Sequence, residues 1–116
     1  MRSYDSLSGD AEFARLRKRG RRIDGAHVAI VGAVAPRGLT RPRIAIVPAK
    51  GLSGAVERNR VRRRTRAALE AVGLPGNGID MIVIARHSAR DVAYTVLCED
   101  MRSTLQRVAV AVVERR

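Results

Sequence analysis

Residues 55–72 read AVERNRVRRRTRAALEAV, and their residue types separate onto two faces when the stretch is placed on a helix. At about 100° per residue, one stripe carries no charge and must face a core. That stripe consists of Val61, Thr65, Ala68, Leu69 and Val72. The opposite face has the i, i+3, i+4, i+7 spacing of neighbours on a helix. It consists of Asn59, Arg62, Arg63 and Arg66, flanked by Arg60 and Arg64. The pattern predicts an amphipathic helix with arginines on its outer face.

The arginines of this helix are concentrated enough to repel one another. Six lie within residues 58–66, and only Glu57 and Glu70 offer local compensation. Like charges four residues apart cost about 0.2–0.5 kcal/mol per pair. A mixed-charge run is usually a solvated helix face, but this run has one sign and contains an asparagine. The helix therefore indicates a polyanionic partner.

The loop before the helix supports the same interpretation. Residues 50–54 read KGLSG, and a glycine-rich loop that leads into a helix can present backbone N–H groups to a phosphate. The loop is not a nucleotide-binding P-loop, because the Gly-Lys-Ser/Thr ending is missing. Loop and arginine face together favour nucleic acid as the partner.

The rest of the chain predicts a small α+β domain in the order α, β, β, α, β, α. A helix capped by Ser8 or Asp10 runs to about Lys18 and stops at Gly20, and residues 1–9 before it are expected to be mobile. Strands are predicted over 26–34, 43–47 and 79–85, the last central in the sheet, with a turn over 36–42 and a further short strand possible over 20–24. The last helix is predicted over 94–113. We expect one RNA-binding domain over 1–116.

Composition narrows the class of protein. The 116 residues include 23 Lys or Arg against 11 Asp or Glu, which gives a net charge of +12, and all but two of the basic residues are arginine. Arginine grips phosphate in a bidentate manner and stacks on bases. No apolar run approaches the roughly 20 residues of a membrane span, and no signal-peptide pattern opens the chain. The single cysteine, Cys98, fits a reducing cytoplasm.

The sequence predicts no catalytic groups of its own. His27 and His87 are far apart and stand in no motif with carboxylates. Asp80 at a strand start, with Glu99 and Asp100 at a helix start, is better explained by capping than by metal binding. Cys98 is expected to be a small packed residue.

The stretch over 50–66, KGLSGAVERNRVRRRTR, resembles the signature of the bacterial ribonuclease P protein component. RIAIVPAK from Arg43, IDMIVIAR from Ile79, residues 13–20 and the closing helix from Glu99 to Val108 are also similar to the family. The resemblance implies a left-handed β-α-β crossover that carries the arginine helix. It implies a protein subunit of ribonuclease P in the cytoplasm, which assists the RNA subunit and its Mg²⁺ ions in removing 5′ leaders from precursor tRNA. No protein partner is evident.

Site residues follow from the resemblance in two sets. The catalytic RNA is expected to contact Lys50, Arg58, Asn59, Arg60, Arg62, Arg63 and Arg66. The single-stranded leader is expected in a cleft lined by Phe13, Arg17, Ala29 and Val31. Arg17 and Val31 stand where the family usually has aromatic residues, and the loop has Gly51 in place of a second lysine and Ser53-Gly54 in place of Gly-Asn. Phe13 is then the one aromatic residue expected in the leader cleft, and a core contact explains it equally well. The guanidinium of Arg17 can stack on a base in place of the missing ring.

Two other classes remain as alternatives. The first is a non-catalytic RNA-binding protein associated with ribosomal or other structured RNA. The second, a DNA-binding protein, is weaker because no helix-turn-helix spacing surrounds the arginine helix.

Overall fold

The computed structural model describes residues 4–36, 41–52, 54–74 and 78–114. In chain order the elements are β1 (Asp5–Ser6), α1 (Asp10–Arg19), β2 (Arg21–Asp24), β3 (Val28–Val34), β4 (Arg43–Pro48), α2 (Ala55–Val72), β5 (Ile79–Ala85), the 3-10 helix η1 (His87–Arg90) and α3 (Tyr94–Glu114). The predicted bounds of α2 and β5 are confirmed, and the optional strand near residue 20 is β2. The central part of the turn predicted over 36–42 lies outside the described residues.

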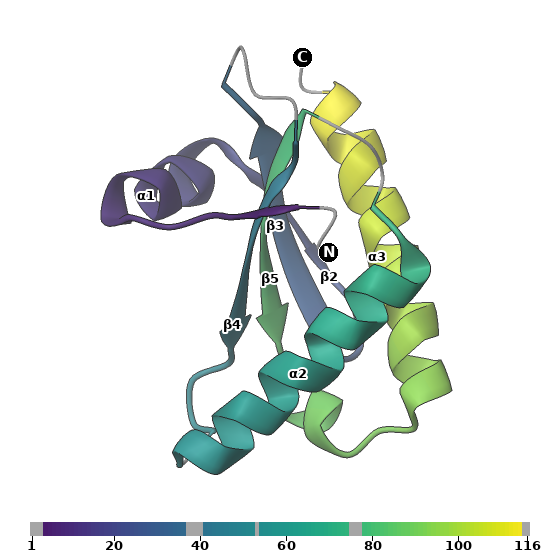
Figure 1. Cartoon of the computed structure of the whole chain (residues 1–116). Coiled ribbons are helices and arrows are strands. Elements are labelled where there is room, and N and C mark those ends of the chain that lie inside the picture. Colours follow the sequence, from purple (N-terminus) through teal and green to yellow (C-terminus); the bar gives the residue numbers. More distant parts are fainter. Residues whose placement is uncertain (1–3, 37–40, 53, 75–77, 115–116) are drawn as a thin grey trace.

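The five strands form one mixed sheet in the order β1-β4-β5-β3-β2, with β5 in the centre as its apolar sequence predicted. β4 and β5 are parallel, whereas β3 pairs antiparallel with both β5 and β2. In Figure 1 the parallel strands β4 and β5 point down, α2 crosses in front of the sheet, and β5 lies to the right of β4. The β4–α2–β5 connection is therefore left-handed, as the resemblance implied.

Helices cover both faces of the sheet. α2 and α3 cover one face, where the main core includes Val28, Ile30, Leu69, Met81 and Leu97. The predicted stripe of α2 is confirmed, because Val61, Thr65, Ala68 and Leu69 are buried and Val72 packs against this core. α1 covers part of the other face through Leu16, which packs in a second cluster with Val31, Ala33 and Ile82. The remainder of that second face is left for the cleft described below.

The N-terminal segment differs from the expected mobile tail over its described part, residues 4–9. Asp5 and Ser6 pair in parallel with Arg43 and Ile44 of β4, and Tyr4 and Leu7 are buried. The predicted caps of α1 were wrong: Gly9 precedes the helix with φ 97°, and neither candidate side chain caps the first turn. The sequence concealed β1 because two strand residues are too few to show an alternating pattern.

Asp80 has a structural role that capping does not describe. Its side chain is fully buried and accepts hydrogen bonds from Arg43 at 3.2 and 2.6 Å and from Arg15 at 2.5 Å. Both arginines also bond to Glu12, at 3.0 and 2.9 Å. Chiefly because Arg15 donates to it, the pKa of Glu12 lies below its usual value, and Asp80 raises the pKa of Arg43. Two carboxylates and two guanidinium groups thus join α1 to the start of β4 and β5.

Asp100 likewise does not cap a helix as predicted. It lies in the second turn of α3, and its carboxylate accepts the backbone N–H groups of Ala26, His27 and Val28 at 2.8–3.0 Å. These three hydrogen bonds fix the turn between β2 and β3. The strand β3 accordingly begins at Val28 and not at residue 26, where it was predicted to begin. Glu99 is exposed and bonds to Arg102 at 2.5 Å.

Candidate nucleic-acid interface

The outer face of α2 carries the predicted arginines to the surface. Arg58, Asn59, Arg60 and Arg63 are exposed, and Arg62 and Arg66 are half-buried. Within the described residues, no carboxylate forms an ion pair with Arg58, Arg62, Arg63 or Arg66, and Arg60 reaches Asp91 only at 4.0 Å. We call Asn59, Arg62, Arg63 and Arg66, which line a shallow hollow of about 360 Å³, the arginine face. Its positive charge is left without an acidic partner among the described residues.

One side-chain hydrogen bond orders part of this face. Arg62 donates from Nη1 to Oδ1 of Asn59 at 3.1 Å, so the asparagine positions a guanidinium one turn away. The Nε of Arg66 is buried and has no hydrogen-bond partner. A buried donor without a partner costs about 1–3 kcal/mol.

Arg64 belongs to the same run of arginines but faces the protein. It donates from Nη1 to the carbonyl oxygens of Ala89 at 2.7 Å and Arg90 at 2.8 Å, and from Nη2 to that of Val92. Beside it, Arg90 reaches back to Glu57 of α2 at 2.9 Å. Arg64 therefore joins α2 to the segment after β5. This structural role accounts for one of the six closely spaced arginines, and no ligand is needed to explain it.

The loop before α2 is held by the same segment. Nε2 of His87 lies 2.8 Å from the carbonyl oxygen of Lys50, and because a carbonyl only accepts, Nε2 carries the proton. Gly51 has φ 96°, and a Cβ there would lie 3.1 Å from the His87 ring. Gly51 thus occupies a position where glycine suits both the backbone conformation and the contact with His87. The side chain of Lys50 is exposed and lines the neighbouring cleft.

The predicted cleft lies between α1 and the face of the sheet opposite α2, and its volume is about 920 Å³. Phe13 and Arg17, one turn apart on α1, line it together, and Val31 lines it from β3. Phe13 also packs against the second core cluster, so it serves both of the roles that the sequence left open. The cleft is rimmed by charge and floored by aliphatic side chains.

Ala29 was a wrong assignment to this cleft. It lies on the same face of β3 as Val31 but is fully buried and does not line the cleft. Its methyl group is shorter than the side chains of its cross-strand partners, Asp24 and Ile84, and leaves no accessible surface. The sequence missed Arg22, which lines the cleft from β2; its pairing with Val31 was the available signal, but β2 was only an optional strand.

The arginine face and the cleft meet at the edge of β4. A hollow of about 320 Å³ there is lined by Arg62 and Arg66 on the side of α2, and by Phe13 and Val47 on the side of the cleft. Phe13 and Val47 line the cleft as well, and the two arginines line the hollow of the arginine face. A strand of nucleic acid therefore has a continuous basic path between the two predicted sites.

Other functional signals are scarce over the described part of the chain. No group of three or more His, Cys, Asp or Glu side chains there could hold a metal ion. None of the helices described is long and apolar enough to cross a membrane. His27 bonds to Ser88 at 2.8 Å, and Cys98 is half-buried against the main core.

The fold and its basic path define a nucleic-acid-binding α+β domain. Comparison with known proteins identifies the family within this class: residues 1–109 match the family model described as Ribonuclease P. A ribonuclease P protein component from Gluconacetobacter diazotrophicus is 33% identical over 106 residues, which cover 90% of each chain. That from Thermus brockianus is 36% identical over 102 residues, and the match covers 88% of this chain but 59% of the relative.

Solved structures share the fold. A mutant Staphylococcus aureus RNase P protein has a TM-score of 0.77 at 23% identity, with 90% of this chain and 87% of that chain covered. The RNase P protein from Thermotoga maritima has a TM-score of 0.74 at 22% identity, with coverage of 90% and 97%. The chain belongs to the ribonuclease P protein family. Its role is that of the protein subunit in an RNA-based endoribonuclease for tRNA 5′ maturation.

Proposed function

We propose that the arginine face, with Lys50, Arg58 and Arg60, binds the catalytic RNA subunit, and that the cleft of Phe13, Arg17 and Val31 binds the 5′ leader of precursor tRNA. The observation that carries this proposal is a set of guanidinium groups at the surface of α2 that have no carboxylate partner among the described residues, those of Arg58, Arg62, Arg63 and Arg66. RNA phosphates relieve the repulsion between them, and each contact releases counterions.

The leader is held differently from the RNA subunit. The cleft offers one aromatic ring, Phe13, and the guanidinium of Arg17 beside it, above an aliphatic floor that includes Val31 and Ile82. Unpaired bases stack on rings and on guanidinium planes, so an extended single strand suits this cleft, whereas the bases of a duplex are already paired and stacked on one another. The partner in the cleft is therefore the unpaired end of precursor tRNA in the cytoplasm.

Bond cleavage is assigned to the RNA subunit and its Mg²⁺ ions. The protein's part is to neutralise phosphate charge and to position the leader, which lowers the Mg²⁺ concentration that the RNA needs. The decisive experiment is reconstitution with a matched catalytic RNA. Protein alone is expected to leave precursor tRNA intact in Mg²⁺, and the holoenzyme is expected to cleave at a lower Mg²⁺ concentration than the RNA alone. Cleavage by RNA-free protein contradicts the proposal.

A competing assignment is binding to ribosomal or other structured RNA. Capture of RNA on the tagged protein, followed by sequencing, separates the two. One dominant RNA that is active in the reconstitution supports the ribonuclease P assignment, and enrichment of ribosomal RNA instead overturns it.

A further inference from the structure

The loop that carries Lys50 and the segment that carries His87 follow the two parallel strands of the sheet. The strands β4 and β5 end at Pro48 and Ala85, which are partners in the register, so both segments leave the sheet at the same end (Figure 1). His87 begins η1, and its Nε2 donates to the carbonyl oxygen of Lys50 at 2.8 Å. This contact joins the loop before α2 to a segment 37 positions further along the chain.

The segment that carries His87 is anchored on two sides. On one side, Arg64 of α2 donates to three carbonyl oxygens of residues 89–92. On the other side, Oγ of Ser88 lies 2.8 Å from Nδ1 of His27, in the turn between β2 and β3. The imidazole of His87 therefore projects from a backbone that the rest of the fold holds in place.

The side chain of Lys50 needs such a support. It is exposed, lines the cleft, and forms no ion pair with any described residue. A lysine carries a point charge on a flexible four-carbon stem, so the reach of its ammonium group depends on how the backbone presents it. Gly51, the next residue, has φ 96° and no Cβ, and its backbone rotates more freely than that of other residues. The hydrogen bond from His87 restrains the peptide unit between Lys50 and Gly51.

We propose that His87 is a positioning residue for RNA binding: it holds the carbonyl group of Lys50 and thereby directs the Lys50 ammonium group to an RNA phosphate. The proposal rests on the proposed function, in that Lys50 contacts RNA, and it adds a residue that acts without touching RNA itself. A backbone that is oriented beforehand loses less conformational freedom on binding. The phosphate can come from the RNA subunit or from the leader, because Lys50 precedes α2 and also lines the cleft. The experiment below separates these two sources.

The first test measures RNA affinity against salt concentration for His87→Ala, Lys50→Gln and the double variant. One phosphate contact contributes about 0.7–0.9 to the slope of log affinity against log salt, or about fourfold to sixfold between 1 M and 0.15 M salt. Lys50→Gln is expected to lose about this much. His87→Ala removes no charge at pH 8, where an ordinary imidazole is neutral. It is nevertheless expected to lower affinity about twofold to fourfold and to flatten the slope. A weaker affinity with the parental slope contradicts the proposal, since no cation has then been displaced.

The double variant tests whether His87 acts through Lys50. It is expected to match Lys50→Gln, because without the ammonium group nothing is left to direct. A further loss of the size seen in His87→Ala alone shows that His87 acts independently, and overturns the proposal. His87→Gln is expected to restore binding, since its amide nitrogen can take the place of Nε2 as donor. His87→Asn is too short to reach the carbonyl group and is expected to behave like His87→Ala.

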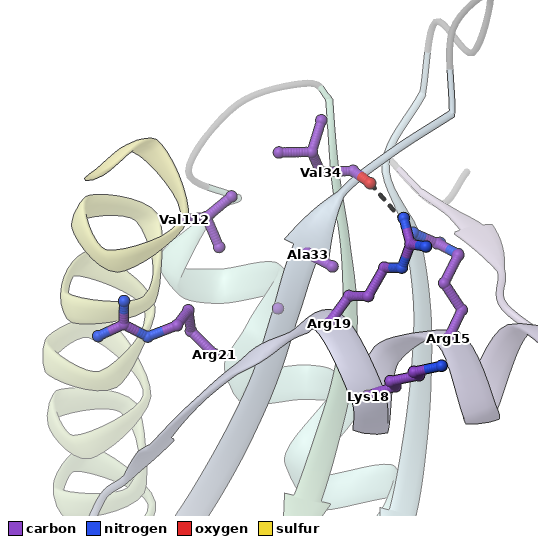
Figure 2. A pocket seen from close by; sticks show the side chains of 8 residues that line it. Arg15, Lys18, Arg19, Arg21, Ala33, Val34 and Val112 are labelled. Atoms are coloured by element: carbon purple, nitrogen blue, oxygen red, sulfur yellow. Dashed lines mark hydrogen bonds between the residues drawn. The ribbon is translucent and has the colours of Figure 1, made fainter. Parts of the chain in front are cut away.

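Two control variants separate this role from a general disturbance. Ser88→Ala removes the neighbouring hydrogen bond to His27 and leaves the contact with Lys50 in place. Lys18→Gln removes one exposed charge on α1, at a cavity that shares no lining residue with the cleft (Figure 2). Both are expected to change RNA affinity by less than about twofold, because charges outside the contact are screened by salt. If Ser88→Ala weakens binding as much as His87→Ala, the effect belongs to η1 as a whole and the proposal is overturned.

The two RNAs are measured separately. An effect on the isolated RNA subunit assigns the phosphate to that subunit, and an effect confined to the holoenzyme's preference for precursor over mature tRNA assigns it to the leader. If Lys50→Gln weakens one of these and His87→Ala matches the parent, or if Lys50→Gln weakens neither, this inference is overturned. The proposed function stands in both cases as long as Arg63→Ala weakens binding of the RNA subunit, and it fails if Arg63→Ala does not.

A second test observes the loop directly in the full chain without RNA. The backbone amide of Gly51 shares its peptide unit with the carbonyl group of Lys50, and its order parameter is measured by ¹⁵N relaxation. The order parameter is expected to fall in His87→Ala, because the peptide unit loses its restraint, and to keep the parental value in His87→Gln. An unchanged order parameter in His87→Ala shows that His87 does not restrain the loop, and overturns the proposal.

Discussion

Two neighbouring residues of α2, Arg63 and Arg64, are expected to give opposite results when each is replaced by alanine. Arg64 donates three hydrogen bonds to carbonyl oxygens of the segment after β5. Hydrogen bonds that involve a charged group contribute about 1.5–3 kcal/mol each, and because Arg64 is only half-buried, water replaces part of the loss. Arg64→Ala is therefore expected to lower the free energy of unfolding by about 2–4 kcal/mol.

This loss is large enough to measure by thermal unfolding. The unfolding entropy of about 2.1 cal/mol/K per residue corresponds to a shift of about 4 °C per kcal/mol for this chain, so Arg64→Ala is expected to lower Tm by about 8–16 °C. Arg63→Ala is the matched control, because Arg63 is exposed and bonds to no described residue. Its stability is expected to stay within about 0.5 kcal/mol of the parent, while its affinity for the RNA subunit falls about tenfold to a hundredfold.

Unfolding curves and RNA binding, measured on the same preparations below the Tm of both variants, check the contrast. If Arg64→Ala keeps the parental Tm and weakens RNA binding as Arg63→Ala does, then Arg64 faces the RNA and the assignment of helix faces is refuted. Arg64→Lys adds a graded point, since one ammonium group cannot span three carbonyl oxygens and should restore only part of the Tm.

Further predictions concern the ion-pair network and the cleft. Asp80→Asn leaves two guanidinium groups against a neutral amide and is expected to cost about 3–5 kcal/mol in urea unfolding; a cost below about 1 kcal/mol would mean that water screens the pairs. Because the hydrogen bond from Arg15 lowers the pKa of Glu12 from 4.5, the stabilisation that Glu12 provides is complete above about pH 4.5 and is lost as the pH falls through the folded-state value. Glu12→Gln should therefore flatten the acid side of the stability profile, and an unchanged profile would exclude the pairing. Arg17→Tyr is expected to raise the ratio of holoenzyme affinities for precursor and mature tRNA, since a base–aromatic stack is worth about 1–3 kcal/mol; an unchanged ratio would show that Arg17 does not contact the leader.

The sequence by itself determined the parts that depend on local periodicity. The apolar stripe from Val61 to Leu69 specified a helix, and the apolar run over residues 79–85 specified a central strand, each with its bounds. Both patterns depend only on residues that are close in the chain, so they can be identified without the fold. The family signature and the arginine excess pointed to RNA, since charge density and motif spacing are also local properties.

Only the tertiary structure decided which of these residues face a ligand. Arg63 and Arg64 are the same residue type at adjacent positions. Arg64 nevertheless lies against backbone carbonyl groups, because η1 covers its side of α2, whereas Arg63 is exposed. Ala29 shares the alternation of Val31 but is covered by its neighbours. Asp80 accepts a hydrogen bond from Arg15, which is 65 positions away in the chain, and no local sequence pattern predicts such a partner. The continuity of the cleft with the arginine face likewise depends on β4, at whose edge residues of α1 and α2 line one hollow. These features arise from contacts between segments that are distant in the chain, and no local pattern specifies them.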